Sequence, residues 1–86
     1  MSRYRIEFLK TAQKELAKLP QEMRRRIATK IDSLAGNPYP PDSKKLKNGN
    51  GRLRIRVGEY RIIYRLEDDQ LVILVIKIGH RRDVYK

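Results

Sequence analysis

Residues 52–66 read RLRIRVGEYRIIYRL, and this stretch decides the fold of the chain. In its first half, apolar residues alternate with arginines, a period of two that predicts a strand with one apolar and one basic face. The second half is rich in β-branched and aromatic residues and predicts the return strand. Between the two strands stands Gly58-Glu59, a two-residue turn with glycine at the position that a type II′ hairpin favours.

The two-residue turn sets the register of the hairpin, and a slip of one residue would turn every side chain to the other face. Three apolar pairs are predicted on one face: Leu53 with Tyr64, Ile55 with Ile62, and Val57 with Tyr60. The other face is predicted to pair Arg52 with Arg65, Arg54 with Ile63, and Arg56 with Arg61. Like charges directly opposite each other destabilise a sheet, whereas arginine binds phosphate through two parallel hydrogen bonds. The repeated pattern therefore favours a phosphate chain that lies across the basic face.

The segments on either side of the hairpin predict two helices and two more strands. Residues 4–8 alternate in character and predict a short strand, and residues 71–78 are apolar enough for a strand inside the sheet. Pro20 separates two helices, the second of which has apolar residues at spacings of three and four. The order is β-α-α-β-β-β. We expect an α+β fold with an antiparallel sheet and a helical hairpin packed on one face, as a single domain over residues 1–86.

The chain carries a net charge of +11, from 21 Lys and Arg residues against 10 Asp and Glu residues. This excess predicts a polyanionic partner, either a nucleic acid or an acidic protein. On the second helix, Arg24, Arg25 and Arg26 are interpreted as a solvated surface rather than a direct contact with RNA. No apolar run is long enough to span a bilayer, and the start of the chain leads into no signal-type apolar stretch. A cytoplasmic protein without a membrane partner is expected.

The residue types present argue against metal-dependent nuclease chemistry, so any hydrolysis or transfer would have to use side chains alone. The chain has no cysteine, and Asp68-Asp69 stands on a predicted turn without further ligands at metal-binding spacings. Neither a metal nor another cofactor is therefore expected. RNA still permits cleavage, because its own 2′-OH can attack the adjacent phosphate. That reaction needs a base, cations for the developing negative charge, and an acid or electrophile for the leaving oxygen.

The C-terminal box holds the candidates for this proton transfer. His80 is the only histidine, and histidine is the side chain type that titrates near neutral pH. It stands beside Arg81 and Arg82, which favours a functional role over that of an ordinary surface histidine. Tyr85 is interpreted either as a side chain that stacks on a base or as an anchor that packs on the core.

Three segments together carry a family resemblance. They are the hairpin of residues 52–64, the segment Asn37-Pro38-Tyr39-Pro40-Pro41 before Lys44-Lys45-Leu46, and the closing Gly79-His80-Arg81-Arg82-Asp83-Val84-Tyr85. In this combination and order they resemble the RelE toxins of the RelE/ParE superfamily, which belong to type II toxin–antitoxin systems. The resemblance implies an endoribonuclease that cuts mRNA in the ribosomal A site without a metal. It also implies a RelB-like antitoxin that wraps the toxin, and contact with operator DNA only through the toxin–antitoxin complex.

The resemblance also implies roles for individual residues. Arg61 matches the arginine that stabilises the phosphate charge, Arg81 the arginine that serves the leaving group, and Tyr85 the tyrosine that stacks on the substrate. Arg52 and Arg54 fall where prominent members carry lysines, one of which is credited with the role of base. Arginine holds its proton too firmly for that role, so we assign the base to His80. The predicted catalytic set is Arg54, Arg61, His80, Arg81 and Tyr85, and the predicted RNA-binding set is Arg52, Arg56, Arg65, Lys44, Lys45, Lys47 and Arg82.

Two other functions remain open at this point. ParE-type toxins share the scaffold but poison DNA gyrase and generally lack the cleavage residues, so the presence of Arg61, Arg81 and Tyr85 favours the RelE type. A non-enzymatic module that binds structured RNA through its basic sheet is the third hypothesis. For any of the toxin readings we expect a monomeric free protein and an antitoxin that is acidic or lays an amphipathic helix on its surface.

Overall fold

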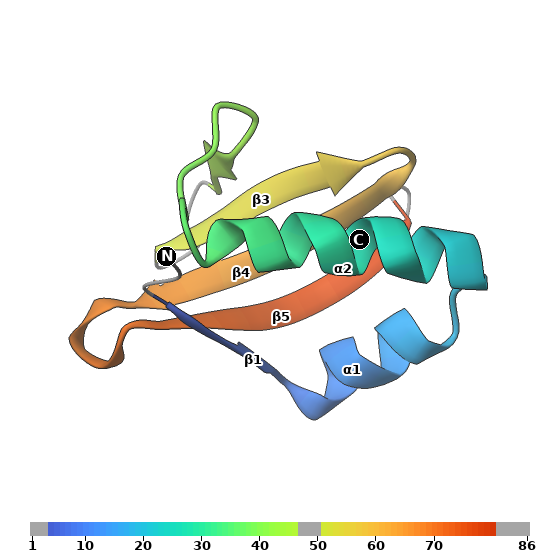
Figure 1. Ribbon diagram of the computed structural model, residues 1–86, viewed down its shortest axis with the longest axis horizontal. Helices are drawn as coiled ribbons and strands as arrows, with labels where there is room; N and C mark the ends of the chain where they lie inside the picture. The colour runs from blue at the N-terminus through green and yellow to red at the C-terminus, as the bar shows by residue number, and fades with distance from the viewer. Residues whose placement is uncertain (1–3, 47–50, 81–86) are drawn as a thin grey trace.

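A computed structural model describes residues 4–46 and 51–80 of the chain. The elements are β1 (Arg5–Phe8), α1 (Lys10–Ala17), α2 (Gln21–Leu34), β2 (Lys44–Lys45), β3 (Arg52–Val57), β4 (Tyr60–Glu67), a 3₁₀ turn (Asp68–Gln70) and β5 (Val72–His80). The strands form one sheet in the order β1-β5-β4-β3-β2. Figure 1 shows α2 lying across one face of this sheet, with α1 beside the end of β1. Within the described residues, no helix is long and apolar enough to cross a membrane.

The predicted α+β fold and its order of helices and long strands are confirmed, with two differences in the sheet. The sheet is mixed rather than antiparallel, because β1 runs parallel to β5. Strands joined by a tight turn must run antiparallel. β1 and β5 are separated by all the other elements, so they are free to pair in parallel. The second difference is β2, whose two residues are too short to show any periodicity in the sequence.

The predicted register of the β3–β4 hairpin is confirmed in all its pairs. Gly58 has a φ of +57°, whereas Glu59 is not among the residues with positive φ. A positive φ at the first turn position alone is the signature of a type II′ turn. Its backbone twist matches the twist of the two strands, so the pairing can begin directly on either side of it.

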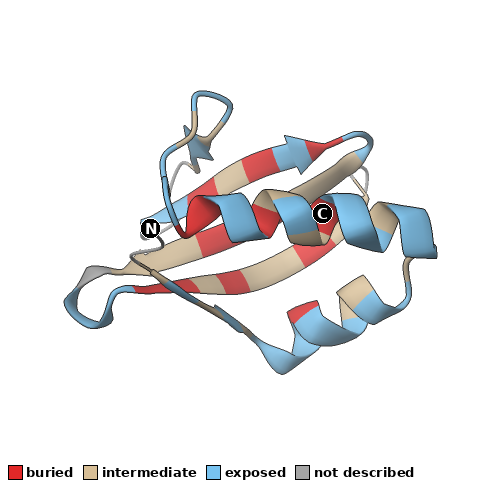
Figure 2. Cartoon of the chain, viewed as in Figure 1, coloured by how far each residue is buried: buried red, intermediate tan, exposed pale blue. Residues whose placement is uncertain are grey.

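The apolar face of the hairpin forms the core together with α2 and β5, and Figure 2 shows the buried residues recurring along the strands beneath α2. The side chains that are fully buried include Ile27 and Ile31 from α2 and Tyr64, Ile73 and Val75 from β4 and β5. The ladder between β4 and β5 shifts at Ile63/Tyr64, so that Ile62 pairs with Ile78 but Tyr64 pairs with Val75. This bulge lets both Val75 and Ile78 belong to the core cluster, although they are three residues apart.

The edge of β5 is covered by two different elements in turn. β1 pairs with β5 only as far as Phe8 opposite Val75, while β5 continues to His80. Beyond that point, the carboxylate of Glu15 in α1 accepts a hydrogen bond of 3.0 Å from the backbone N–H of Ile78. Its other oxygen pairs with Lys77 Nζ at 3.3 Å. At Ile78, Glu15 therefore takes the place of a neighbouring strand as hydrogen-bond acceptor.

Tyr64 ties the loop that follows α2 to the centre of the sheet. Its ring is fully buried, and its hydroxyl donates a hydrogen bond of 2.7 Å to the carbonyl oxygen of Pro38. Burial raises the pKa of Tyr64 from 10.0 to about 12, against a smaller lowering by a hydrogen bond with Ser43. The position of the proline-rich loop thus depends on one residue of the core.

We predict that Tyr64→Phe lowers the free energy of unfolding at neutral pH by about 1 kcal/mol, because the Pro38 carbonyl loses its partner. The unfolded chain ionises Tyr64 from a pKa near 10.0, before the folded chain does at about 12, so wild-type stability falls as the pH rises through this window. Ionisation of Tyr64 lowers the free energy of unfolding of the wild type by about 2 to 3 kcal/mol at most. Phenylalanine does not ionise, so the variant does not undergo this loss. Urea unfolding of both proteins should therefore show that the difference between their unfolding free energies shrinks above pH 10 and then changes sign. A difference that stays constant would contradict this role.

Candidate nucleic-acid interface

The sheet face opposite the helices carries a cluster of arginines, which we call the arginine face. Side chains alternate between the two faces of a strand, so the core positions of β3 and β4 fix the direction of the residues between them. The members of the arginine face are Arg52, Arg54, Arg56, Arg61 and Arg65. Lys44 of β2 pairs with Arg54 and extends this face, whereas Lys45 pairs with Leu53, a core residue. The structure thus brings together all the predicted RNA-binding residues of β3 and β4, but places Lys45 on the other side.

Like charges do stand directly opposite each other in the hairpin, as Arg56 pairs with Arg61 and Arg52 with Arg65. The second pair is partly compensated, because Arg65 donates to Glu67 on the same strand at 2.7 and 3.0 Å. Ile63, between Arg61 and Arg65, is only 7% exposed although it lies on this face. Long charged side chains cover apolar surface with their stems while the charged ends reach outward. The arginine face is therefore a packed layer with cationic ends.

One end of the arginine face is hollowed. A cavity of about 330 Å³ is lined by Asp42, Lys44, Arg54, Arg56 and Arg61, and we call it the arginine pocket. Arg61 is one of these lining residues, and its Nε and Nη1 atoms are buried. The volume of the pocket lies at the lower end of the range for small-ligand sites. Four cations around one carboxylate make the pocket suitable for a phosphate with part of its sugar.

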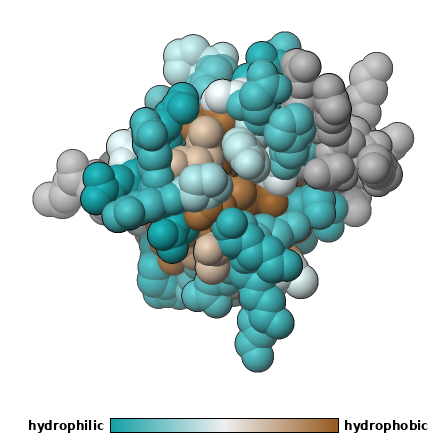
Figure 3. Space-filling model, turned by 90° about the vertical axis from the view of Figure 1, so that its right-hand side faces the viewer, coloured by the Kyte–Doolittle hydropathy of each residue, from teal (hydrophilic) through white to brown (hydrophobic). Residues whose placement is uncertain are grey.

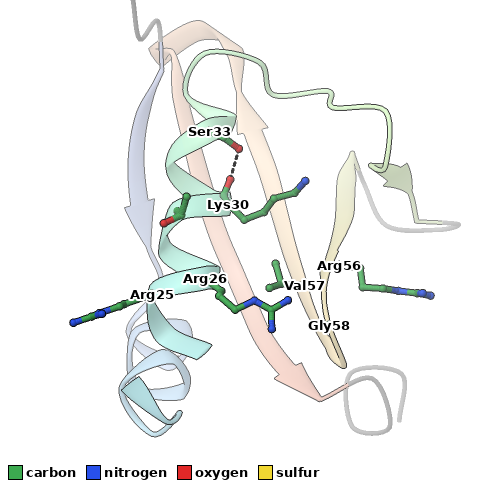
Figure 4. A pocket seen from close by; sticks show the side chains of 8 residues that line it. Arg25, Arg26, Lys30, Ser33, Arg56, Val57 and Gly58 are labelled. Atoms are coloured by element: carbon green, nitrogen blue, oxygen red, sulfur yellow. Dashed lines mark hydrogen bonds between the residues drawn. The ribbon is translucent and has the colours of Figure 1, made fainter. Parts of the chain in front are cut away.

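A second hollow lies on the helix side of the hairpin, between α2 and β3, with a volume of about 540 Å³. Its lining residues are Arg25, Arg26, Thr29, Lys30, Ser33, Arg56, Val57 and Gly58. Figure 4 shows Arg26 reaching toward Val57 and Gly58, while Arg25 and Arg56 point away in opposite directions. Arg56 lines both hollows, so basic surface continues around the edge of the sheet. Arg25 and Arg26, interpreted from the sequence as solvated helix surface, thus border a groove.

His80 lies apart from the arginine pocket. It ends β5 opposite Tyr60, and the two rings meet edge to face with centroids 5.7 Å apart. Tyr60 packs against the core, so His80 is on the helix side of the sheet. Arg61 instead stands opposite Gly79, on the other face. The role of His80 as a base stays a prediction, but the structure does not bring it together with Arg61.

The sequence reasoning missed Asp42, which the structure places among the predicted arginines. No local signal in the sequence marks it, because Asp42 lies in a turn whose position depends on the hydrogen bond from Tyr64 to Pro38, 26 residues apart. Four predicted site residues lie outside the described part of the chain: Lys47, Arg81, Arg82 and Tyr85. Within residues 4–46 and 51–80, no three side chains of His, Cys, Asp or Glu gather as a metal site would require.

Known proteins resemble this chain in sequence and in fold. Residues 6–85 match the family model described as the ParE toxin of the type II toxin–antitoxin system, parDE. A putative RelE-like toxin protein of Escherichia coli is 33% identical over 87 residues, which cover 96% of this chain and 90% of the relative. The mRNA interferase toxin RelE of Escherichia coli strain K12 is 28% identical over 80 residues, which cover 91% of this chain and 83% of the relative. RelE in the crystal structure of the archaeal RelE–RelB complex from Pyrococcus horikoshii OT3 has a TM-score of 0.81 at 31% identity, with 95% of this chain and 99% of that chain covered.

We predict that Arg56→Glu stabilises the protein but weakens its binding to RNA. An opposite charge across from Arg61 replaces a repulsive pair, worth about 0.2 to 1 kcal/mol, whereas the loss of a cation should reduce the slope of binding against salt by about one unit or more. Urea unfolding and RNA titrations at several salt concentrations measure the two effects.

Arg24→Glu is the matched control, because it makes the same charge change at an exposed position of α2. It should leave the hairpin repulsion in place and alter RNA binding less. If both variants weaken RNA binding equally, net charge rather than the arginine face is responsible.

Proposed function

The chain belongs to the RelE/ParE family of toxins from type II toxin–antitoxin systems, and from this premise we propose that it is an RNA-cleaving toxin of the RelE type. In this proposal it cuts mRNA in the ribosomal A site and so inhibits translation. The observation that supports it most is the arginine pocket, where Arg54, Arg56 and Arg61 meet on the sheet face that the helices leave open. The name of the relative from Escherichia coli strain K12, mRNA interferase toxin, agrees with this chemistry.

The reaction that this pocket suits is attack by the 2′-OH of the RNA on its own phosphate. Arg61 and Arg54 bind the oxygens of the scissile phosphate and stabilise the charge that develops on them. Guanidinium groups that already line the pocket are effective there, because little reorganisation is needed when that charge forms. Following the resemblance, Arg81 serves the leaving 5′-oxygen and Tyr85 stacks on a base. The remaining cations of the arginine face, with Lys47 and Arg82, guide the RNA backbone.

A RelB-like antitoxin is the partner that we propose for the free toxin. The relative from Pyrococcus horikoshii was crystallised as a complex with RelB. At the end of the molecule where α1 meets α2, Figure 3 shows apolar surface surrounded by hydrophilic side chains. An amphipathic antitoxin segment with acidic residues would suit such a surface. We further propose that operator DNA is bound only through this complex, and that the protein works as a single domain in the cytoplasm.

Inhibition of DNA gyrase is the second candidate function, because the matching family model is described by the ParE toxin. The arginine pocket favours the RelE type over it, since a poison of a protein target does not need guanidinium groups around a phosphate-sized cavity. A non-catalytic RNA-binding module would use the same arginine face without cleavage.

Primer extension on a defined mRNA in a purified translation system tests the proposal. We predict cuts within the A-site codon that need ribosomes, and a loss of about 100-fold or more in Arg61→Ala because one phosphate-stabilising group is removed. Arg24→Ala, on the exposed part of α2, is the control and should cut normally. Thermal unfolding of both variants checks that they fold.

Other outcomes would point elsewhere. Intact mRNA together with gyrase-dependent DNA breaks would support the ParE type, and tight RNA binding without any cut would support the binding module. If Arg61→Ala folds and cleaves like the wild type, the arginine pocket is not the cleavage site.

A further inference from the structure

We propose that Asp42 is the general base of the cleavage reaction, the group that takes the proton from the attacking 2′-OH. This inference rests on the proposed function and deepens it, because it names the residue that completes the arginine pocket. Among the five residues that line this pocket, Asp42 is the single carboxylate. The other four are a lysine and three arginines, and guanidinium groups do not give up their proton in proteins.

The topology of the sheet gives Asp42 a position that His80 does not have. Arg61, the residue proposed to bind the scissile phosphate, lines the same cavity as Asp42. His80 belongs to the helix side of the sheet, with its ring against Tyr60. A general base must be within hydrogen-bonding reach of the proton that it removes, and geometry decides before basicity does. Asp42 lines the same cavity as Arg61, whereas His80 does not, so Asp42 is the better placed of the two.

Contacts before, at and after Asp42 in the chain hold it in place. The segment before it is anchored by the hydrogen bond from Tyr64 to the Pro38 carbonyl. The turn that contains it is closed by Ser43, whose backbone N–H and hydroxyl both donate to the Pro40 carbonyl, at 2.9 and 2.8 Å. Two residues later, Lys44 pairs with Arg54 in the sheet. A catalytic group needs this kind of support, because small displacements are costly in rate.

Lys30 orients the carboxylate itself. It extends from α2, as Figure 4 shows, and its Nζ pairs with Asp42 Oδ2 at 2.9 Å. Both side chains are partly exposed, at 31% and 46%, so the ion pair adds little stability. The ion pair instead sets the orientation of the carboxylate: Lys30 binds Oδ2, which leaves Oδ1 to take the proton. Lys30 is accordingly a positioning residue, and the sequence gives no sign of its link to a loop beyond the end of α2.

The chemical step balances without a further reagent. Asp42 Oδ1 accepts the proton of the 2′-OH while the 2′-oxygen forms a bond to phosphorus. The bond from phosphorus to the 5′-oxygen breaks, and the 5′-oxygen takes a proton from water or from an acid beside it. The products are a 2′,3′-cyclic phosphate and a 5′-hydroxyl. The protonated Asp42 then returns its proton to solvent.

Single-turnover cleavage of mRNA on purified ribosomes tests this assignment. Asp42→Asn keeps the shape of the side chain but cannot take the proton, so we expect the rate of cleavage to fall by about 100-fold or more. Binding to the ribosome should persist or tighten, since a negative charge leaves the arginine pocket. Asp42→Glu should restore part of the rate. Asp32→Asn, the same change at an exposed position of α2, is the matched control and should cleave normally.

The variant Lys30→Met tests whether Asp42 acts as the general base or only anchors the loop through its ion pair with Lys30. It removes the ion pair but leaves the carboxylate, so we expect a loss of less than about tenfold, well below that of Asp42→Asn. Equal losses in the two variants, or wild-type cleavage by a folded Asp42→Asn, would overturn the assignment. If the wild type itself does not cleave, the proposed function fails instead, and the two failures are thereby distinguished.

Discussion

The register of the β3–β4 hairpin is the constraint on which the rest of the structure depends. Gly58 takes a φ of +57° at the turn, and each residue of β3 then has one fixed partner on β4. A slip by one residue would bring arginines into the core and apolar side chains to the surface. Because every member of the arginine face has core residues as its neighbours along the strand, the burial of Ile55 and Ile62 also positions Arg54, Arg56 and Arg61.

This arrangement combines a cost in stability with a gain in binding. Arg56 opposite Arg61 repels within the hairpin, and the core beneath offsets the repulsion. The same coupling between core and site recurs at Tyr64, whose buried hydroxyl holds the loop that delivers Asp42. Sites on loops are usually less exact than sites on strands, and the bond to Pro38 reduces that difference. The core therefore positions both the loop and the arginine pocket.

The parts of this molecule that could be predicted from its sequence are those that depend on near neighbours. The period of two in residues 52–57 and the turn at Gly58-Glu59 are local signals, and the register that they predict is confirmed. Asp42 is different, because its place in the arginine pocket depends on the bond between Tyr64 and Pro38, which are 26 residues apart in the sequence. The side on which His80 lies was equally hidden. The apolar run of β5 does not alternate with polar residues, so the sequence does not show which face each residue occupies. The bulge at Ile63/Tyr64 also shifts the register of β5 against β4.

The central claim is that RNA lies across the arginine face, and site-specific photo-cross-linking tests it most directly. A photoreactive phenylalanine analogue would be placed at Arg52 on this face or at Gln21 on the exposed surface of α2. Ribosomes would carry an mRNA with 2′-deoxy nucleotides in the A-site codon, so that the substrate stays intact. The account predicts cross-links to this codon or its neighbours from position 52 and few from position 21. Efficient cross-linking from position 21 alone would contradict it.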